Sequence, residues 1–138
     1  MIIDATNLIA GRIASIAAKK ALLGETIEIV NCENAIITGN RQAILAKNKR
    51  FKDMGLWSQG PFFYKMPHQY LKRIIRGMLP YKKYHGERAY KKIKCYLGVP
   101  DHLQGKKLET IKTANISKLS NLKYMTLKEV CKQMGAKL

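Results

Sequence analysis

Acidic residues are scarce in this chain of 138 residues, and so are the residue patterns that most enzymes need. Nine Asp and Glu stand against 26 Lys and Arg, which leaves a formal net charge of +17. The acids are dispersed and form no close pair, and the histidines, His68, His85 and His102, sit in different polar segments without a metal partner nearby in the sequence. Neither a G-x-S-x-G motif nor a Walker lysine is present. We therefore expect no enzyme activity, no cofactor and no metal site.

The cysteines and the lengths of the hydrophobic runs argue against a disulfide-bonded, zinc-binding or membrane-spanning protein. Cys32, Cys95 and Cys131 are odd in number, far apart, and include no C-x-x-C pair, so neither a disulfide framework nor a zinc knuckle is expected. We interpret them as small hydrophobic residues of a reduced, cytosolic protein. No run approaches the ~18 apolar residues of a membrane span. The first residues lack the basic and apolar regions of a signal peptide, so the expected location is cytoplasmic.

Positive charge is concentrated in the middle of the chain. Residues 41–94 hold 15 basic and two acidic side chains, a net charge of 15 − 2 = +13. Residues 1–40 have 3 − 4 = −1, and residues 95–138 have 8 − 3 = +5. Charge this dense predicts a polyanionic partner, RNA or DNA, because each neutralised phosphate releases a counterion. The hydrophobic fraction of 46% is sufficient for a folded core, and we expect one domain over residues 1–138.

The N-terminal third predicts a βαβ unit. Residues 2–3 form a short buried strand, residues 11–23 a helix with apolar residues at helical spacing, and residues 26–31 a second strand. Gly24 stands where a left-handed helix cap is expected. Strand, helix and strand in about thirty residues require parallel strands. The chain is therefore predicted to be a layered α/β domain with a mainly parallel sheet.

The rest of the chain predicts helices separated by irregular segments. A basic helix over 40–54, with Ala43, Ile44 and Ala46 facing inward, leads to an aromatic loop over 55–66. The further expected elements are a helix over 67–76 that begins with Pro67, a short helix over 87–92, a strand over 93–97, an irregular strap over 101–123, and a final helix opened by a Thr126–Glu129 capping box.

Gly77 and Pro80 are predicted to form the turn that ends the helix over 67–76. Glycine after an apolar helix often takes a positive φ, and proline prevents the helix from resuming. Met78 and Leu79 would then hold the turn against apolar surface and leave Arg76 free for phosphate. Replacing Gly77 with valine would accordingly misdirect the whole basic segment.

The predicted RNA-binding side chains are mainly basic and lie mostly in this middle segment. They are Arg12, Arg41, Lys47, Lys49, Arg50, Lys52, Lys65, Lys72, Arg73, Arg76, Lys82, Lys83, Tyr84, His85, Arg88, Lys91 and Lys92. Aromatic residues that could stack on unpaired bases interleave with them: Trp57, Phe62, Phe63, Tyr64, Tyr70, Tyr81, Tyr84 and Tyr90. For Phe62 and Phe63, packing of the loop against the core is an equal alternative.

Nucleotide binding at the first helix is the weakest alternative. Gly11 near the start of that helix could cradle a phosphate. The stretch Ile9-Ala10-Gly11-Arg12 lacks the three-glycine pattern, however, so we interpret Gly11 as a site of close helix–sheet packing.

Several short segments together resemble the ribosomal protein L-thirteen family, a component of the large ribosomal subunit. The most specific is Arg76-Gly77-Met78-Leu79-Pro80. The others are Ile3-Asp4-Ala5, Gly11-Arg12-Ile13-Ala14-Ser15, Val30-Asn31-Cys32-Glu33, Thr38-Gly39, Gly60-Pro61 and Tyr96-Leu97-Gly98-Val99-Pro100. Their order and rough spacing match over about residues 1–103, and residues 104–138 form a C-terminal strap and helix outside this match. The start at the first strand and the long aromatic loop resemble the archaeal and eukaryotic branch.

The resemblance implies a three-layer α/β/α sandwich around a small parallel sheet, with a basic excursion and a C-terminal helix. It also implies binding and organisation of large-subunit ribosomal RNA beside other ribosomal proteins, without catalysis, cofactor, membrane or small-molecule substrate. Two other functions remain open at this point: a free RNA-binding translational regulator outside the ribosome, and a nucleotide-binding enzyme.

Overall fold

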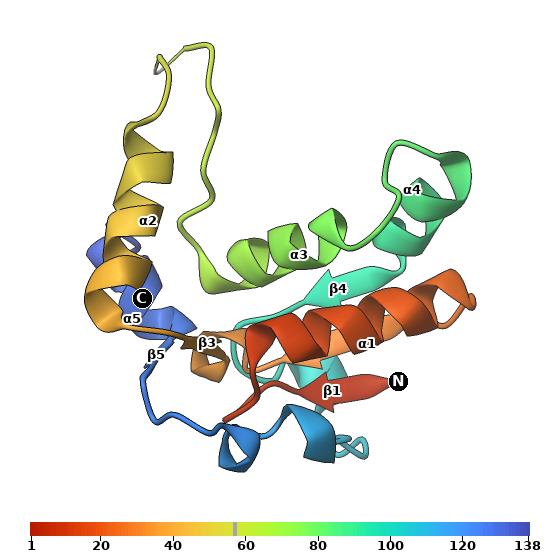
Figure 1. The fold of residues 1–138 in the computed structure, drawn as a ribbon. Helices are drawn as coiled ribbons and strands as arrows, with labels where there is room; N and C mark the ends of the chain where they lie inside the picture. Colours follow the sequence, from red (N-terminus) through yellow and green to blue (C-terminus); the bar gives the residue numbers. More distant parts are fainter. Residues whose placement is uncertain (57) are drawn as a thin grey trace.

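The computed structural model describes residues 1–56 and 58–138, and its α/β architecture confirms the predicted class (Figure 1). The main elements in chain order are β1 (Ile2–Asp4), α1 (Ala10–Leu22), β2 (Ile27–Val30), β3 (Ile36–Thr38), α2 (Arg41–Asp53), α3 (Pro67–Gly77), α4 (Tyr84–Lys91), β4 (Ile93–Cys95), β5 (Tyr124–Thr126) and α5 (Leu127–Gln133). Short 3₁₀ helices lie at Cys32–Asn34 (η1), Asp101–Leu103 (η2), Lys112–Ala114 (η3) and Ile116–Lys118 (η4).

The main sheet is parallel, in the order β1-β2-β4. Ile3 pairs with Ile29, and Ile29 pairs in turn with Cys95. Successive residues of a strand point to opposite faces, so Ile27 and Ile29 are buried on one face while Glu28 points to the other. There the Glu28 carboxylate accepts a hydrogen bond from the Tyr96 hydroxyl at 3.4 Å and lies 3.8 Å from His102 Nε2 of η2.

Helix α1 packs closely because alanine lines its buried side. Its buried residues are Ala10, Ile13, Ala14, Ala17, Ala18 and Ala21. The helix ends where predicted, with Gly24 at φ +100°. The interpretation of Gly11 is wrong: this glycine is exposed, and an added Cβ would meet nothing within 4 Å. Its small size therefore does not serve packing.

Helix α3 lies beside α1 and β4, and it carries the basic segment on the main core (Figure 1). Pro67 occupies its first position, as predicted, and Leu71 and Ile75 are completely buried. Leu79, just beyond the helix, is 5% exposed and holds the following turn against the core. The same expectation for Met78 is wrong, because that side chain is 44% exposed.

The C-terminal segment adds structure that periodicity did not indicate. The backbone at Glu109 extends the sheet beside β1, where its N–H donates to Ile2 at 2.8 Å and its carbonyl accepts from Asp4 at 3.1 Å. Strand β5 was not predicted; it pairs antiparallel with β3 in a second, two-stranded sheet. Thr126 then caps α5 as expected, accepting from the Glu129 N–H at 3.3 Å.

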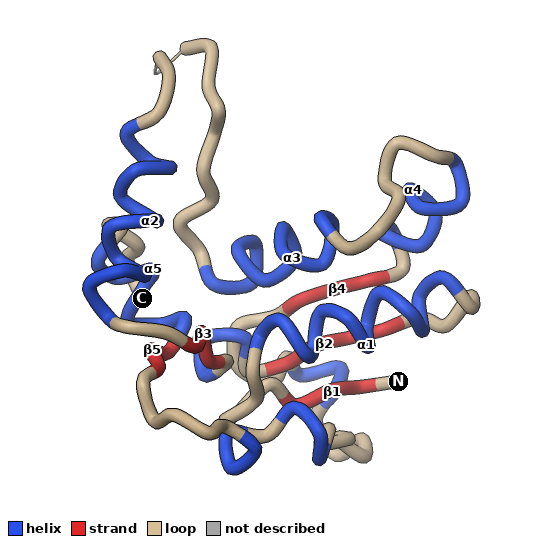
Figure 2. The backbone as a smooth tube through the Cα atoms, in the orientation of Figure 1, coloured by secondary structure: helices blue, strands red, loops and turns tan. Residues whose placement is uncertain are grey.

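Helix α2 and the described parts of the loop after it, residues 41–56 and 58–66, form an arm that projects from the sheet region (Figure 2). Asn40 caps the helix by accepting from the Gln42 N–H at 3.2 Å. Ala43 and Ala46 are exposed, contrary to the prediction, and the buried residues of α2 are Ile44 and Asn48. Ile44 belongs to a small second cluster with Met125, Val130 and Met134. The arm is therefore attached through a much smaller core than α3.

The cysteines act mainly as buried residues. Cys32 and Cys131 are completely buried, and Cys95 is half-buried. A hydrogen bond with Cys95, together with burial, raises the pKa of Cys32, and burial raises the pKa of Cys131 to about 12. Both thiols therefore stay protonated near neutral pH. Among the described residues, no helix has the length and apolar character needed to cross a membrane.

Candidate nucleic-acid interface

Ten of the predicted residues lie on α3, α4 and the turn between them, and we call them the α3–α4 group. They are Lys72, Arg73, Arg76, Lys82, Lys83, Tyr84, His85, Arg88, Lys91 and Lys92. Lys82 and Lys83 are exposed, and neither forms an ion pair within the described part of the chain. Asp53 and Glu87 are the only acids between residues 41 and 94, and Glu87 is paired with Lys91 at 2.7 Å. The group therefore presents almost uncompensated positive charge.

The turn that orients this group depends on Gly86, not on Gly77. Gly77 is the last residue of α3, without the positive φ that we predicted, and a Cβ there would meet nothing within 4 Å. Gly86 is buried inside α4, and a Cβ on it would overlap the carbonyl group of Pro80. The Pro80 carbonyl also accepts from the Lys83 N–H at 2.9 Å. Close packing of α4 on Pro80 thus sets the direction of Lys82 and Lys83.

Three cations of α3 lie over aromatic rings. Lys72 Nζ is 5.0 Å from the ring centre of Tyr90, and the Arg76 guanidinium is 5.0 Å from that of Tyr81. The Arg73 guanidinium lies 5.5 Å from the Phe63 ring, and its Nη1 donates to the Phe62 carbonyl at 2.7 Å. Cation–π contacts limit the conformations of these long side chains while their charge stays available. The α3 cations are therefore held in position before any partner binds.

Three other predicted residues have partners inside the protein. Lys92 Nζ donates to the Gly24 carbonyl at 2.6 Å and so ties α4 to the end of α1. The hydrogen bond from Lys91 lowers the pKa of Glu87, and the same bond raises the pKa of Lys91. Arg12 donates from Nη1 to the Thr113 carbonyl at 2.9 Å. These contacts give the three side chains a structural role besides any contact with phosphate.

The remaining predicted cations lie on the arm. They are Arg41, Lys47, Lys49, Arg50, Lys52 and Lys65, and all six are exposed. The two loop phenylalanines differ. The ring centre of Phe63 lies 6.2 Å from that of Phe51 and 5.7 Å from that of Tyr70, so Phe63 packs inside the protein. Phe62 is 66% exposed. Trp57 lies outside the described residues. The arm thus offers cations and the exposed ring of Phe62 on one projecting element.

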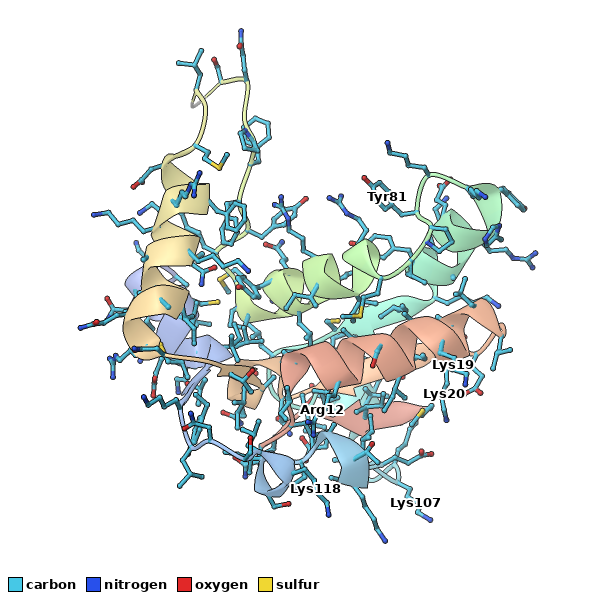
Figure 3. The ribbon with its side chains drawn as sticks, viewed as in Figure 1. Arg12, Lys19, Lys20, Tyr81, Lys107 and Lys118 are labelled. Carbon is cyan, nitrogen blue, oxygen red and sulfur yellow. The ribbon has the colours of Figure 1, made fainter. Side chains whose placement is uncertain are left out.

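A third basic region joins Arg12, which the sequence predicted, to strap lysines that it did not predict. In Figure 3, Arg12 on the lower side of α1 and the strap lysines Lys107 and Lys118 below it lie on the side of the molecule away from Tyr81. The hydrogen bond between Arg12 and Thr113 joins the two segments there. The charge of +5 over residues 95–138 was the available signal, but nothing in the local sequence indicated that the strap lies beside α1.

Chemically, these surfaces are suited to binding anions. Arg and Lys form hydrogen bonds and ion pairs with phosphate, and exposed rings stack on bases. Within residues 1–56 and 58–138, no three His, Cys, Asp or Glu side chains gather where they could hold a metal ion. A small parallel sheet with basic helices on a common core defines a basic α/β protein of the type that binds polyanions.

Comparison with known proteins gives the family. The model of the family described as "Ribosomal protein L13" matches residues 1–102, and the chain belongs to this family. A protein named large ribosomal subunit protein uL13 from Methanosarcina barkeri is 45% identical over 137 residues, covering 99% of this chain and 98% of the relative. The protein of the same name from Archaeoglobus fulgidus is 42% identical, covering 97% and 86% respectively, and that from Haloarcula marismortui is 41% identical, covering 99% and 91%. The predicted resemblance and its archaeal character are confirmed.

Proposed function

We propose that this chain is a structural constituent of the large ribosomal subunit, and that it binds and organises ribosomal RNA through the α3–α4 group. The observation that carries the proposal is the turn at Pro80: it projects Lys82 and Lys83 from a rigid base, and Glu87, the acid nearby in sequence, is already paired. Full-length similarity to archaeal uL13 proteins supports the ribosomal setting. In this function the protein works in the cytoplasm without catalysis or cofactor.

The distribution of charge supports contacts with more than one RNA segment. The α3–α4 group, the arm, and the region around Arg12 and the strap are three basic surfaces, and the first two meet where Arg73 contacts Phe62 and Phe63 (Figures 1 and 3). A rigid core that holds such surfaces in fixed positions can fix the relative positions of RNA helices, because each surface binds backbone phosphates without requiring a base sequence. Neighbouring ribosomal proteins complete the proposed set of partners.

Replacement of Lys82 and Lys83 by glutamate tests the proposal. The matched control is Lys128→Glu with Lys132→Glu on α5, which makes the same change in net charge at two exposed lysines outside the three surfaces. We expect the first variant to bind large-subunit RNA more weakly and to reduce the log–log salt slope of affinity by about 2, because two phosphates are no longer neutralised. The fold should be unaffected, since both side chains are exposed.

Incorporation into large subunits gives the second measurement. The variant at Lys82 and Lys83 should be depleted from large subunits washed at high salt, while the α5 control should remain. Equal affinity, slope and incorporation for the two variants would reject the α3–α4 group as the RNA-binding surface. Release of the unaltered protein from subunits at high salt would instead favour a regulator that acts outside the ribosome.

A further inference from the structure

A recess lies between the start of α3, the end of α4 and strand β4, next to the α3–α4 group. Its volume is about 390 Å³, within the range of about 300–1,000 Å³ that is usual for small-ligand sites. The residues that give it chemical character are Tyr64, His68, Lys72, Tyr90, Lys94 and Tyr96. β4 is the last strand of the main sheet, so the recess opens at the edge of the fold.

Aromatic rings form much of the recess. Tyr64 comes from the loop before α3, Tyr90 from the end of α4, and Tyr96 directly follows β4. Tyr90 is held under the Lys72 ammonium, and Tyr96 is held by its hydrogen bond to Glu28 and by edge contact with His102 at 5.4 Å between ring centres. Rings fixed in this way form a stacking platform at small entropic cost.

The polar groups of the recess favour an anionic partner. Lys72 and Lys94 bring two ammonium groups, and the described residues that line the recess include no carboxylate. His68 Nδ1 is buried and has no hydrogen-bond partner among the described residues. Burial and the nearby Lys72 lower the pKa of His68, so its ring is neutral near pH 7, with one nitrogen that donates and one that accepts.

We propose that this recess binds a single unpaired nucleotide of RNA, with its base among Tyr64, Tyr90 and Tyr96 and its phosphate beside Lys72 and Lys94. The inference rests on the proposed function and adds a specific site to it. Lys72 and Arg76 are four residues apart on α3 and so lie on the same side of the helix. Both side chains can therefore bind successive phosphates of an RNA strand that runs from the recess toward the turn at Pro80. Duplex RNA cannot enter, because its bases are already stacked and paired.

Tyr64→Ala and Tyr81→Ala provide a matched pair of variants to test the site. The two tyrosines are 45% and 44% exposed, and both lie beside an arginine, at 6.0 Å from Arg73 and 5.0 Å from Arg76 respectively. Only Tyr64 belongs to the recess. The probes are a short single-stranded oligoribonucleotide of mixed sequence carrying 5-iodouridine, the same oligonucleotide annealed to its complement, and free uridine monophosphate. Affinity is measured for the full chain, and circular dichroism checks the fold.

We expect Tyr64→Ala to weaken single-strand binding roughly five- to 150-fold, the range for loss of one base–aromatic stack, and to leave duplex binding nearly unchanged. Tyr81→Ala removes the ring beneath Arg76, outside the recess, so it should change single-strand and duplex affinity to the same extent and leave their ratio unchanged. Photocrosslinks should map to peptides containing Tyr64, Tyr90 or Tyr96. Cys95 also lines the recess, and its alkylation should slow when the single strand is bound.

Four results would overturn the inference: equal ratios for the two variants, crosslinks confined to other surfaces, no protection of Cys95, or equally tight binding of free uridine monophosphate. A protein side chain found in the recess in crosslinked native subunits would do so as well. Each of these leaves the proposed function intact if Lys82 and Lys83 still govern affinity for large-subunit RNA. Failure of the charge-reversal test with a specific effect at Tyr64 would instead reject only the proposed role of Lys82 and Lys83.

Discussion

Helices α3 and α2 both carry dense positive charge, but they are attached to the protein in different ways. α3 lies against α1 and β4, with Leu71 and Ile75 completely buried in the main cluster. α2 buries Ile44 and Asn48, and its hydrophobic contact is the small cluster with Met125, Val130 and Met134. The cations of α3 rest on aromatic rings, whereas those of α2 lie along a projecting element.

The difference gives two ways of presenting charge to a polyanion. Cations on a rigid base lose little conformational entropy on binding, so they can define the geometry of the contact. Exposed cations on a lightly attached arm add affinity for phosphate but can adjust to the shape of the partner. We infer that the α3–α4 group positions the protein on RNA and that the arm follows, so changes that loosen α3 should have the larger effects.

The largest expected effect comes from the main core. Ile29→Ala should lower the free energy of unfolding by about 2–5 kcal/mol, because Ile29 is completely buried at the centre of the sheet. Ile44→Ala should cost about 2 kcal/mol at most, since its cluster is small and close to the surface. Urea unfolding followed by circular dichroism measures both. Equal losses of unfolding free energy would show that the arm is as firmly attached to the main core as α3.

Gly86→Ala is expected to have the next largest effect, and it tests whether the α3–α4 group is rigidly set. The added methyl group overlaps the Pro80 carbonyl, so α4 must move away from the turn. Overpacking of this kind costs about 1–3 kcal/mol. RNA affinity should fall as well, because Lys82 and Lys83 are redirected together. Unchanged affinity in a folded Gly86→Ala protein would mean that these lysines bind without a fixed geometry.

Replacement of Asp4 should change the free energy of unfolding by a smaller amount, and the change should depend on pH. The Asp4 carboxylate accepts three hydrogen bonds, from Asn31 Nδ2 at 3.0 Å, the Thr6 N–H at 3.1 Å and the Thr6 hydroxyl at 2.8 Å. Burial raises the pKa of Asp4, but these hydrogen bonds together outweigh burial and lower the pKa below 3.8. Such a carboxylate contributes stability above pH 3.8 that is lost as the pH falls through its folded pKa.

Asp4→Asn should therefore cost about 1–2 kcal/mol at neutral pH, because charge-assisted bonds become neutral ones. The difference from the unaltered protein should shrink as the pH falls below 3.8, where the native carboxyl also becomes neutral. Urea unfolding across this pH range measures it. A difference that does not depend on pH would assign the cost to packing rather than to charge.

The comparison also shows what could be predicted from the sequence. The βαβ unit could be predicted from local signals: the apolar, β-favouring residues Ile27 and Ile29 and the helix cap at Gly24. The start of α3 was predicted in the same way, from Pro67. β5 was missed because three residues carry little periodic signal and their partner, β3, is distant in the sequence. The exposed lysines could be predicted from the density of charge in the sequence. The recess could not, because its walls come from four segments: α3, the loop that precedes it, α4 and β4.

The error over Gly77 has the same origin. A glycine at a helix end predicts a left-handed cap, and the signal for Gly86, a glycine near the start of a short helix, is weaker. The role of Gly86 arises from a tertiary contact with Pro80, which no local pattern encodes. Local rules therefore located the turn correctly but assigned it to the wrong glycine.

Gly77→Ala follows from this correction and is the smallest expected effect. Gly77 is helical and its Cβ position is open, so alanine fits without strain and reduces the conformational freedom of the unfolded chain. The substitution should stabilise the protein by about 0.4–1 kcal/mol, measured by urea unfolding, with RNA affinity unchanged. Even Gly77→Val, which the sequence alone predicts to disrupt the basic segment, should be incorporated into large subunits. Loss of RNA binding in Gly77→Ala, with stability retained, would mean that RNA approaches this backbone too closely for a methyl group and that the contact extends onto the end of α3 itself.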